Sequence, residues 1–123
     1  MRVVLDTTIL IDHLRGSPSA GAYLGSLADR PACSEVTRIE VITGLRSADL
    51  HSAEALFALI EWIPLEESIA RRAGDLARRF RASHPGIDAA DLAVAGTAQH
   101  LGAELATGNV KHFPMFPGLT APY

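Results

Sequence analysis

Long apolar runs and cysteines are scarce in this sequence. No stretch approaches the roughly 20 consecutive apolar residues that a membrane-spanning helix needs. The single cysteine, Cys33, has no partner for an internal disulfide, and its place in a predicted strand favours a buried structural thiol over a reactive one. Residues 2–5 read as a strand followed by Asp6, not as a charged-then-apolar signal peptide. We therefore expect a cytoplasmic protein with no membrane partner.

Zinc-binding spacings and lysines are equally scarce. The five histidines are scattered, so His84 and His100 are expected at surfaces or helix ends and not at a zinc ion. The only lysine is Lys111. An aspartyl-phosphate phosphatase of the haloacid-dehalogenase type, with Asp6 as nucleophile, would need a mid-chain lysine and an acid where Thr8 stands. A phosphoacceptor receiver domain would need the same lysine and an acidic pair at the first strand, so both classes are disfavoured.

The composition that is present is typical of one globular domain. Hydrophobic residues make up 48% and charged residues 20%, with 10 glycines and 7 prolines, and no linker or repeat divides the chain. The net charge of −3 argues mildly against tight non-specific binding to nucleic acid. That average hides a local cluster of arginines on one predicted helix: Arg71, Arg72, Arg78, Arg79 and Arg81. They are typical of a solvated helix face; alternatively they form part of a phosphate-contacting surface.

Predicted strands and helices alternate along the chain. Short apolar runs predict strands at residues 2–5, 31–34, 62–65 and 105–107, with a final edge strand near Leu119. Helical spacing and stop signals predict helices at residues 9–14, 20–27, 35–45, 49–60 and 66–81, and one that opens at Asp88. This alternation predicts an α/β fold, a three-layer α/β/α sandwich around a mostly parallel sheet of four to five strands.

The apolar positions of three predicted helices define expected inner faces. Helix 66–81 is expected to bury Ile69, Ala73, Leu76, Ala77 and Phe80. The other two stripes are Val36, Ile39, Ile42 and Thr43 in helix 35–45, and Leu56, Leu59 and Ile60 in helix 49–60. Residues 112–114, His-Phe-Pro, are expected to close the core.

Each acidic residue of interest has a structural explanation as well as a functional one. Asp6 ends the first strand, where open α/β sheets place ligand sites, but it could equally be a helix N-cap worth about 1 kcal/mol. Glu40 lies within a helix, where a glutamate is commonly solvated or paired with arginine. Asp88 and Asp91 have the spacing of a capping box. Because Asp91 precedes the small apolar run Leu-Ala-Val-Ala-Gly-Thr-Ala, its carboxylate also needs a partner: a cation, an arginine or a metal.

The acids indicate a functional site more strongly as a group than they do singly. Asp6, Glu40, Asp91 and Asn109 follow or flank elements that can converge on one carboxyl edge of a parallel sheet. Three carboxylates and an amide offer only oxygen ligands, which suit Mg²⁺ or Mn²⁺. Such an ion lowers the pKa of bound water and holds the oxygens of a phosphodiester.

Three segments carry a resemblance to a known family: VVLDTTILID at residues 3–12, SEVTRIEVITGL at 34–45 and DLAVAGTAQHLGAELATGNVKHF at 91–113. In this order, and over essentially the whole chain (residues 1–123, one domain), they resemble the PIN-domain ribonucleases, and among these the VapC-type toxins of bacterial toxin–antitoxin pairs. The last segment is the most specific: an acid, a small apolar pair, and a strand ending Thr-x-Asn ahead of a phenylalanine.

The resemblance implies roles for particular residues. Asp6, Glu40 and Asp91 match the three acids that hold one or two Mg²⁺ or Mn²⁺ ions, and Thr7 matches the hydroxyl residue beside the first acid. Many PIN domains have an aspartate where this chain has Asn109, so a second metal site is expected to be weak or to form only with substrate. Two further departures concern His112, where related toxins often have an acid, and Asp88, which aligns with no core acid.

The resemblance also implies an activity and partners. The expected activity is metal-dependent endoribonuclease cleavage of tRNA, rRNA or mRNA, which inhibits translation until a cognate VapB-type antitoxin inserts a peptide near the acids. A homodimer is expected, and Arg38, Arg46 and Lys111 are candidates to surround the site and contact RNA. The competing hypothesis is a PIN-like module that has lost its metals and acts only by binding protein partners.

Overall fold

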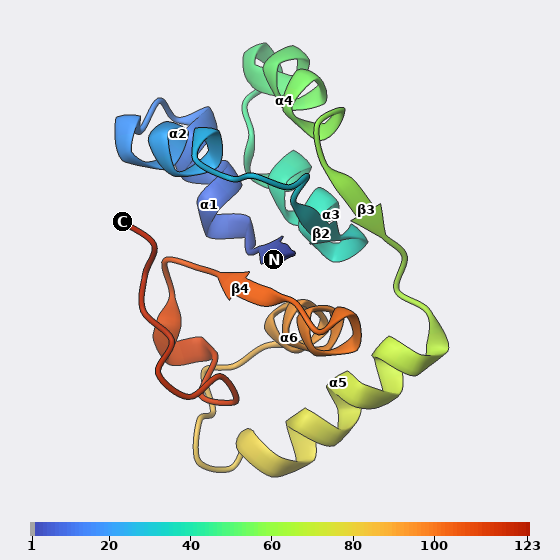
Figure 1. Cartoon of the computed structure of the whole chain (residues 1–123). Helices are drawn as coiled ribbons and strands as arrows, with labels where there is room; N and C mark the ends of the chain where they lie inside the picture. Colours follow the sequence, from blue (N-terminus) through green and yellow to red (C-terminus); the bar gives the residue numbers. More distant parts are fainter. Residues whose placement is uncertain (1) are drawn as a thin grey trace.

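The computed structural model describes residues 2–123, which form four strands and six α-helices (Figure 1). The first half of the chain contains β1 (Val3–Leu5), α1 (Thr7–Leu14), α2 (Pro18–Gly25), β2 (Ala32–Ser34) and α3 (Glu35–Gly44). The second half contains α4 (Leu50–Phe57), β3 (Glu61–Ile63), α5 (Glu67–Phe80), α6 (Ala89–Leu101) and β4 (Glu104–Ala106), with 3₁₀ turns at Ser47–Asp49 and Val110–His112. The predicted alternation is confirmed, with boundaries shifted by one or two residues at most elements.

The four strands form one parallel sheet in the order β3-β2-β1-β4. Val4 lies opposite Ala32 on one side and Leu105 on the other, so β1 is the central strand that joins the two halves. Every residue of β1 and β2 is buried, as expected for strands covered on both faces. Strand order reverses at β1, and ligands of open α/β sheets bind beyond the carboxyl ends of the strands at such a point. Asp6 stands there.

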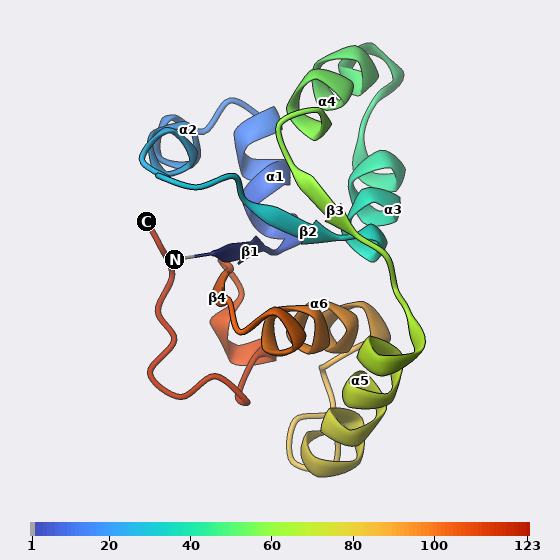
Figure 2. The same ribbon diagram turned by 45° about the vertical axis from the view of Figure 1, so that its right-hand side comes forward.

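Helices cover both faces of the sheet (Figure 2). One core, beneath α1 to α4, includes Leu5, Leu10, Val41 and Phe57. The other lies between the sheet, α5, α6 and the C-terminal segment, and it includes Val94 and Phe113. The three-layer α/β/α arrangement is confirmed, and none of the helices in residues 2–123 is long and apolar enough to cross a membrane.

Helix α6 is the central helix of the second core. It begins with the predicted capping box: Asp88 Oδ1 accepts from the Asp91 backbone amide at 2.8 Å, and Asp91 Oδ2 accepts from the Asp88 amide at 3.2 Å. It ends at Gly102, whose φ of 61° closes the helix in the left-handed conformation. At Gly96, α5 comes so close that a Cβ would lie 3.2 Å from the Ile69 carbonyl oxygen. The almost uncharged run of residues 92–98 is therefore buried because α6 lies between the sheet and α5.

The predicted inner face of α3 is largely wrong. Ile39 is 64% exposed and Ile42 is 43% exposed, whereas Thr37 and Val41 are buried. Helix α3 packs against α1 and α6, and these neighbours contact the Thr37–Val41 side of the helix. The prediction placed the Ile39 and Ile42 stripe inside, but apolar side chains on one stripe can also form an exposed face.

Two smaller predictions are also corrected. Leu59 is 67% exposed, because α4 ends at Phe57 and the following turn points Leu59 outward while Ile60 is buried. Within residues 2–123 no strand forms near Leu119, which packs against the core from an irregular segment. The buried thiol is confirmed, since burial raises the pKa of Cys33 to about 12.

Candidate active site

Asp6 lies between the ends of β1 and β4, at the point where the strand order of the sheet reverses. It follows β1 directly, its side chain is only 4% exposed, and its Oδ2 accepts hydrogen bonds from Thr107 Oγ1 at 2.7 Å and Thr8 Oγ1 at 3.2 Å. Asp6 occupies the N-cap position of α1, but its carboxylate caps no backbone amide of the described residues. The sequence left helix capping open as one of two explanations for Asp6, and its side chain therefore does not cap the helix.

Glu40 reaches the same edge from α3. Thr7 Oγ1 donates to Glu40 Oε1 at 2.5 Å, and it lies 3.5 Å from Thr37 Oγ1. Because Thr7 follows Asp6 in the chain, this hydrogen bond brings the Glu40 carboxylate beside the first acid. Glu40 is thus neither fully solvated nor paired with an arginine within residues 2–123.

A loop after β4 supplies the remaining polar groups. Thr107 Oγ1, which donates to Asp6, accepts a hydrogen bond from the backbone N–H of Asn109 at 3.0 Å. His112 Nδ1 lies 2.9 Å from Asn109 Nδ2 and 3.0 Å from Asp91 Oδ2. A ring nitrogen makes one in-plane hydrogen bond at a time: it donates to Asp91 when it carries a proton and accepts from Asn109 when it does not. The loop therefore contacts Asp6 through Thr107 and Asp91 through His112.

The structure thus gathers Asp6, Thr7, Glu40, Asp91 and Asn109 around one sheet edge. The sequence analysis assigned no role in the site to Thr8 or Thr107. The feature that could have identified Thr107 is its position between a buried strand and Asn109. Two of the proposed surrounding cations are already engaged. Arg38 pairs with Glu35 and lies over the Trp62 ring at 4.1 Å, and Arg46 pairs with Asp49 at 3.1 Å.

In the described part of the chain, each of the three acids has one hydrogen-bonded carboxylate oxygen and one open carboxylate oxygen. On each carboxylate one oxygen is held by the hydrogen bonds described above, and the other has no hydrogen-bond partner among residues 2–123: Asp6 Oδ1, Glu40 Oε2 and Asp91 Oδ1. None of these three is a fully buried, unsatisfied atom. Open carboxylate oxygens at one edge fit a hard divalent cation such as Mg²⁺ or Mn²⁺. No three acids or histidines of the described chain already enclose an ion position, so the carboxylates would have to move closer together to bind one.

The electrostatics of Asp91 also fit a cation. The pKa of Asp91 is raised to about 6, mainly by burial and also by the negative charges of Asp88 and Asp6. The Asp88 amide and the His112 ring act in the opposite direction. With the side chain only 15% exposed, the ionised carboxylate is poorly stabilised by its present surroundings.

This raised pKa predicts how stability depends on pH. In metal-stripped protein, Asp91 holds its proton up to about pH 6 when folded but loses it near pH 3.8 when unfolded. The free energy of unfolding should therefore fall as pH rises from about 4 through 6, and Asp91→Asn should remove that part of the fall. Urea unfolding of both proteins across this range measures the difference. A wild type and variant that differ by a constant amount at every pH would contradict the assignment.

The chain is similar to known proteins in both sequence and fold. Residues 3–114 match the PIN domain family. Over 98% of the chain, the sequence is 47% identical to ribonuclease VapC19 of Mycobacterium tuberculosis, of which 98% is covered. It is 43% identical to ribonuclease VapC10 of the same species, with 98% of the chain and 92% of the relative covered. A toxin–antitoxin complex from Klebsiella pneumoniae contains a chain with a TM-score of 0.81 and 28% identity, with 98% of both chains covered.

Proposed function

Because the chain belongs to the PIN-domain family of VapC ribonucleases, we propose that it is a metal-dependent endoribonuclease, the toxin of a toxin–antitoxin pair. The observation that carries the proposal is the convergence of Asp6, Glu40 and Asp91, each with one carboxylate oxygen left open, at the carboxyl edge of the parallel sheet. Family membership supports the ribonuclease chemistry, and the position of these three acids supports their proposed role in it.

The described side chains would divide the work as follows. Asp6, Glu40 and Asp91 would hold the cation, which when bound lowers the pKa of the attacking water and offsets charge on the phosphate. Thr107 and Thr8 orient the Asp6 carboxylate, and Thr7 orients that of Glu40. Such fixed orientation reduces the rearrangement needed at each turnover.

Asn109 and His112 complete the site without adding negative charge. Where many relatives have a fourth carboxylate, the Asn109 amide is neutral, and His112 donates to or accepts from its neighbours. The negative charge of three carboxylates balances the charge of one divalent ion more readily than the charge of two such ions. The site is therefore proposed to bind one cation firmly and a second only weakly or together with RNA.

The proposed partners follow from the relatives and from the surface. A cognate VapB-type antitoxin is proposed because similar solved chains come from toxin–antitoxin complexes. A homodimer is proposed through α3, where Ile39 and Ile42 are exposed on either side of Glu40. Such apolar exposure is typical of protein interfaces, and a second copy there would bring two sites close together. The substrate is RNA of the cytoplasm, with tRNA, rRNA and mRNA as candidates.

The experiment that tests the activity is removal of the metal. Purified protein with total RNA and Mn²⁺ should cleave the RNA, and excess EDTA should reduce cleavage to the background rate. Adding Mn²⁺ beyond the EDTA concentration should restore it, which controls for irreversible damage. Cleavage that persists in EDTA would contradict the metal-dependent mechanism.

A metal-free binding module is the alternative, favoured by the neutral Asn109 and by the lack of a preformed ion cage among residues 2–123. Titration calorimetry with Mn²⁺ separates the two functions without an activity assay. The nuclease predicts measurable heat of binding that Asp91→Asn reduces. A titration with no heat, together with no cleavage, would favour the binding module.

A further inference from the structure

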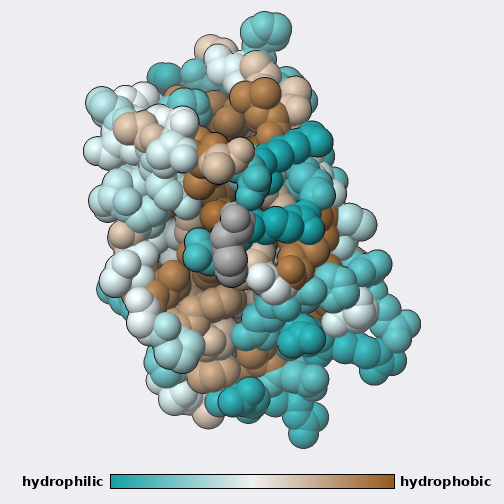
Figure 3. Space-filling view, viewed as in Figure 1, coloured by the Kyte–Doolittle hydropathy of each residue, from teal (hydrophilic) through white to brown (hydrophobic). Residues whose placement is uncertain are grey.

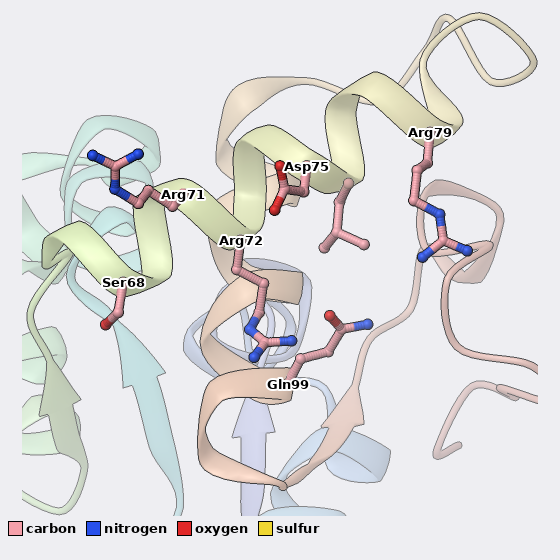
Figure 4. A pocket seen from close by; sticks show the side chains of 7 residues that line it. Ser68, Arg71, Arg72, Asp75, Arg79 and Gln99 are labelled. Carbon is pink, nitrogen blue, oxygen red and sulfur yellow. The ribbon is translucent and has the colours of Figure 1, made fainter.

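A polar hollow lies between α5 and α6, on a part of the molecule that the proposed nuclease site does not use. Its volume is about 350 Å³. It is lined by Ser68, Arg71, Arg72, Asp75, Leu76, Arg79 and Gln99 (Figure 4). In the space-filling view, hydrophilic side chains gather over α5, at the lower right (Figure 3).

Two arginines extend into this hollow from the same flank of α5. Arg72 and Arg79 are seven residues apart, close to two helical turns, so their Cα atoms are about 10 Å apart along the helix axis. Figure 4 shows both side chains extending from α5 toward α6, where Gln99 lies between them. The two guanidinium groups and the amide of Gln99 form a row of hydrogen-bond donors.

These two arginines are available for an external anion. Four other arginines are neutralised by ion pairs: Arg2 with Glu61, Arg38 with Glu35, Arg46 with Asp49, and Arg71 with Glu67. Within residues 2–123, no carboxylate lies within ion-pair distance of Arg72 or Arg79, although Asp75 stands between them on α5. Arg79 is partly held by its contact with the Phe80 ring, 5.3 Å from the guanidinium. An exposed, unpaired guanidinium presents a planar fork that matches a phosphate.

We propose that this hollow binds phosphate groups of the RNA backbone and is a second contact region for the substrate of the proposed nuclease. The proposal rests on that function for the identity of its ligand. Two long side chains whose Cα atoms are about 10 Å apart along the helix axis can reach two different phosphates of one strand. The hollow offers little to a protein partner, because among the described lining residues only Leu76 is a large apolar side chain, and it is buried.

The position of the hollow bears on substrate size. Gln99 follows Asp91 by eight residues in α6, which places it about 12 Å further along the helix, toward the end away from the acids. An RNA that occupies both regions must extend along the α5–α6 side of the molecule. With a net charge of −3, the protein repels RNA on average, so such an extension depends on local positive charge, which Arg72 and Arg79 supply in the hollow. The substrate class is therefore RNA that continues well beyond the cleaved bond, and not a dinucleotide or a short fragment.

The test is equilibrium binding of a labelled single-stranded RNA of about 30 nucleotides, measured by fluorescence anisotropy in EDTA so that no cleavage occurs. The double variant Arg72→Gln/Arg79→Gln should bind about tenfold more weakly, and the slope of log K against log salt should become shallower by about 1.4. The matched control is Arg78→Gln/Arg81→Gln, which removes the same charge from exposed positions outside the hollow. It should change affinity by less than about twofold. Asp75→Asn should tighten RNA binding, because it removes a negative charge from the lining of the hollow.

The outcomes separate this proposal from the nuclease proposal. Equal weakening by the two double variants would show only a general charge effect and would overturn the hollow as a site. Unchanged binding in Arg72→Gln/Arg79→Gln, with an unaltered thermal unfolding curve, would show that these arginines are a solvated face. Neither result depends on catalysis, whereas cleavage by the wild-type protein with Mn²⁺ tests the nuclease alone. Site-specific weakening without any cleavage would keep the hollow as an RNA-binding site and reject the nuclease.

Discussion

Replacing Asp6 by asparagine is expected to lower the rate of RNA cleavage by on the order of 100- to 1,000-fold. Asparagine has nearly the same shape, and its oxygen can still accept from Thr107 and Thr8, so the change mainly removes one negative charge from the proposed cation site. Initial rates in Mn²⁺ measure the effect directly. Expression in a bacterial host extends it: the wild-type chain should arrest growth unless its antitoxin is co-expressed, and Asp6→Asn should allow growth.

The matched control for this prediction is Asp88→Asn. Asp88 is also a carboxylate near Asp91, but its side chain is exposed and caps α6, and asparagine is an equally good N-cap. Its cleavage rate should therefore stay close to that of the wild type. Asp91→Asn should behave like Asp6→Asn. Full activity in both Asp6→Asn and Asp91→Asn would reject the acid cluster as the catalytic centre.

The second large effect is expected from Phe113→Ala, which should lower the free energy of unfolding by about 3–5 kcal/mol. Phe113 is 1% exposed, and it is the largest fully buried side chain of the described residues. It packs in the core formed with α6 and β4, and its ring lies 6.5 Å from that of Phe116. Truncation would leave a cavity directly after the loop that carries Asn109 and His112. Urea unfolding in EDTA would measure the change without a metal contribution.

The control for Phe113→Ala is Leu59→Ala, another truncation of a large apolar side chain. Leu59 is 67% exposed, so its loss should change the free energy of unfolding by less than about 0.5 kcal/mol. Similar destabilisation by both variants would mean that the region around Phe113 is not the tightly packed core that the structure shows. A stable Phe113→Ala protein would lead to the same conclusion.

Much of the fold could be predicted because local sequence and tertiary packing agree. The capping box at Asp88 and Asp91, the buried run after it, and the apolar stripe of α5 each specify one element. The exposed face of α3 could not be predicted in the same way. Hydrophobic spacing shows which residues share a face, but only the positions of α1 and α6 decide that Ile39 and Ile42 point outward.

The candidate site was predictable in part for a similar reason. Asp6 and Asp91 are marked by their positions at a strand end and a helix start, and these positions follow from the sequence. The hydrogen bonds of Thr107 with Asp6 and of His112 with Asp91 join residues 101 and 21 positions apart. Such pairings depend on strand register and loop conformation, which one sequence does not specify. The arginine cluster was visible, but only the structure separates paired Arg71 from unpaired Arg72 and Arg79.

The first strand of the described sheet pairs with β4, so the ribosome must synthesise the chain as far as residue 107 before the site can close. Asp6 emerges early, but its partner Thr107 is 101 residues later, and β1 lacks β4 until residue 106 has emerged. Contacts between such distant residues form late in folding. Before that point, a nascent chain carries Asp6 and Glu40 without the loop residue Thr107 that orients Asp6. Synthesis of Thr107, and not of Asp6, is therefore the step after which the proposed site can assemble.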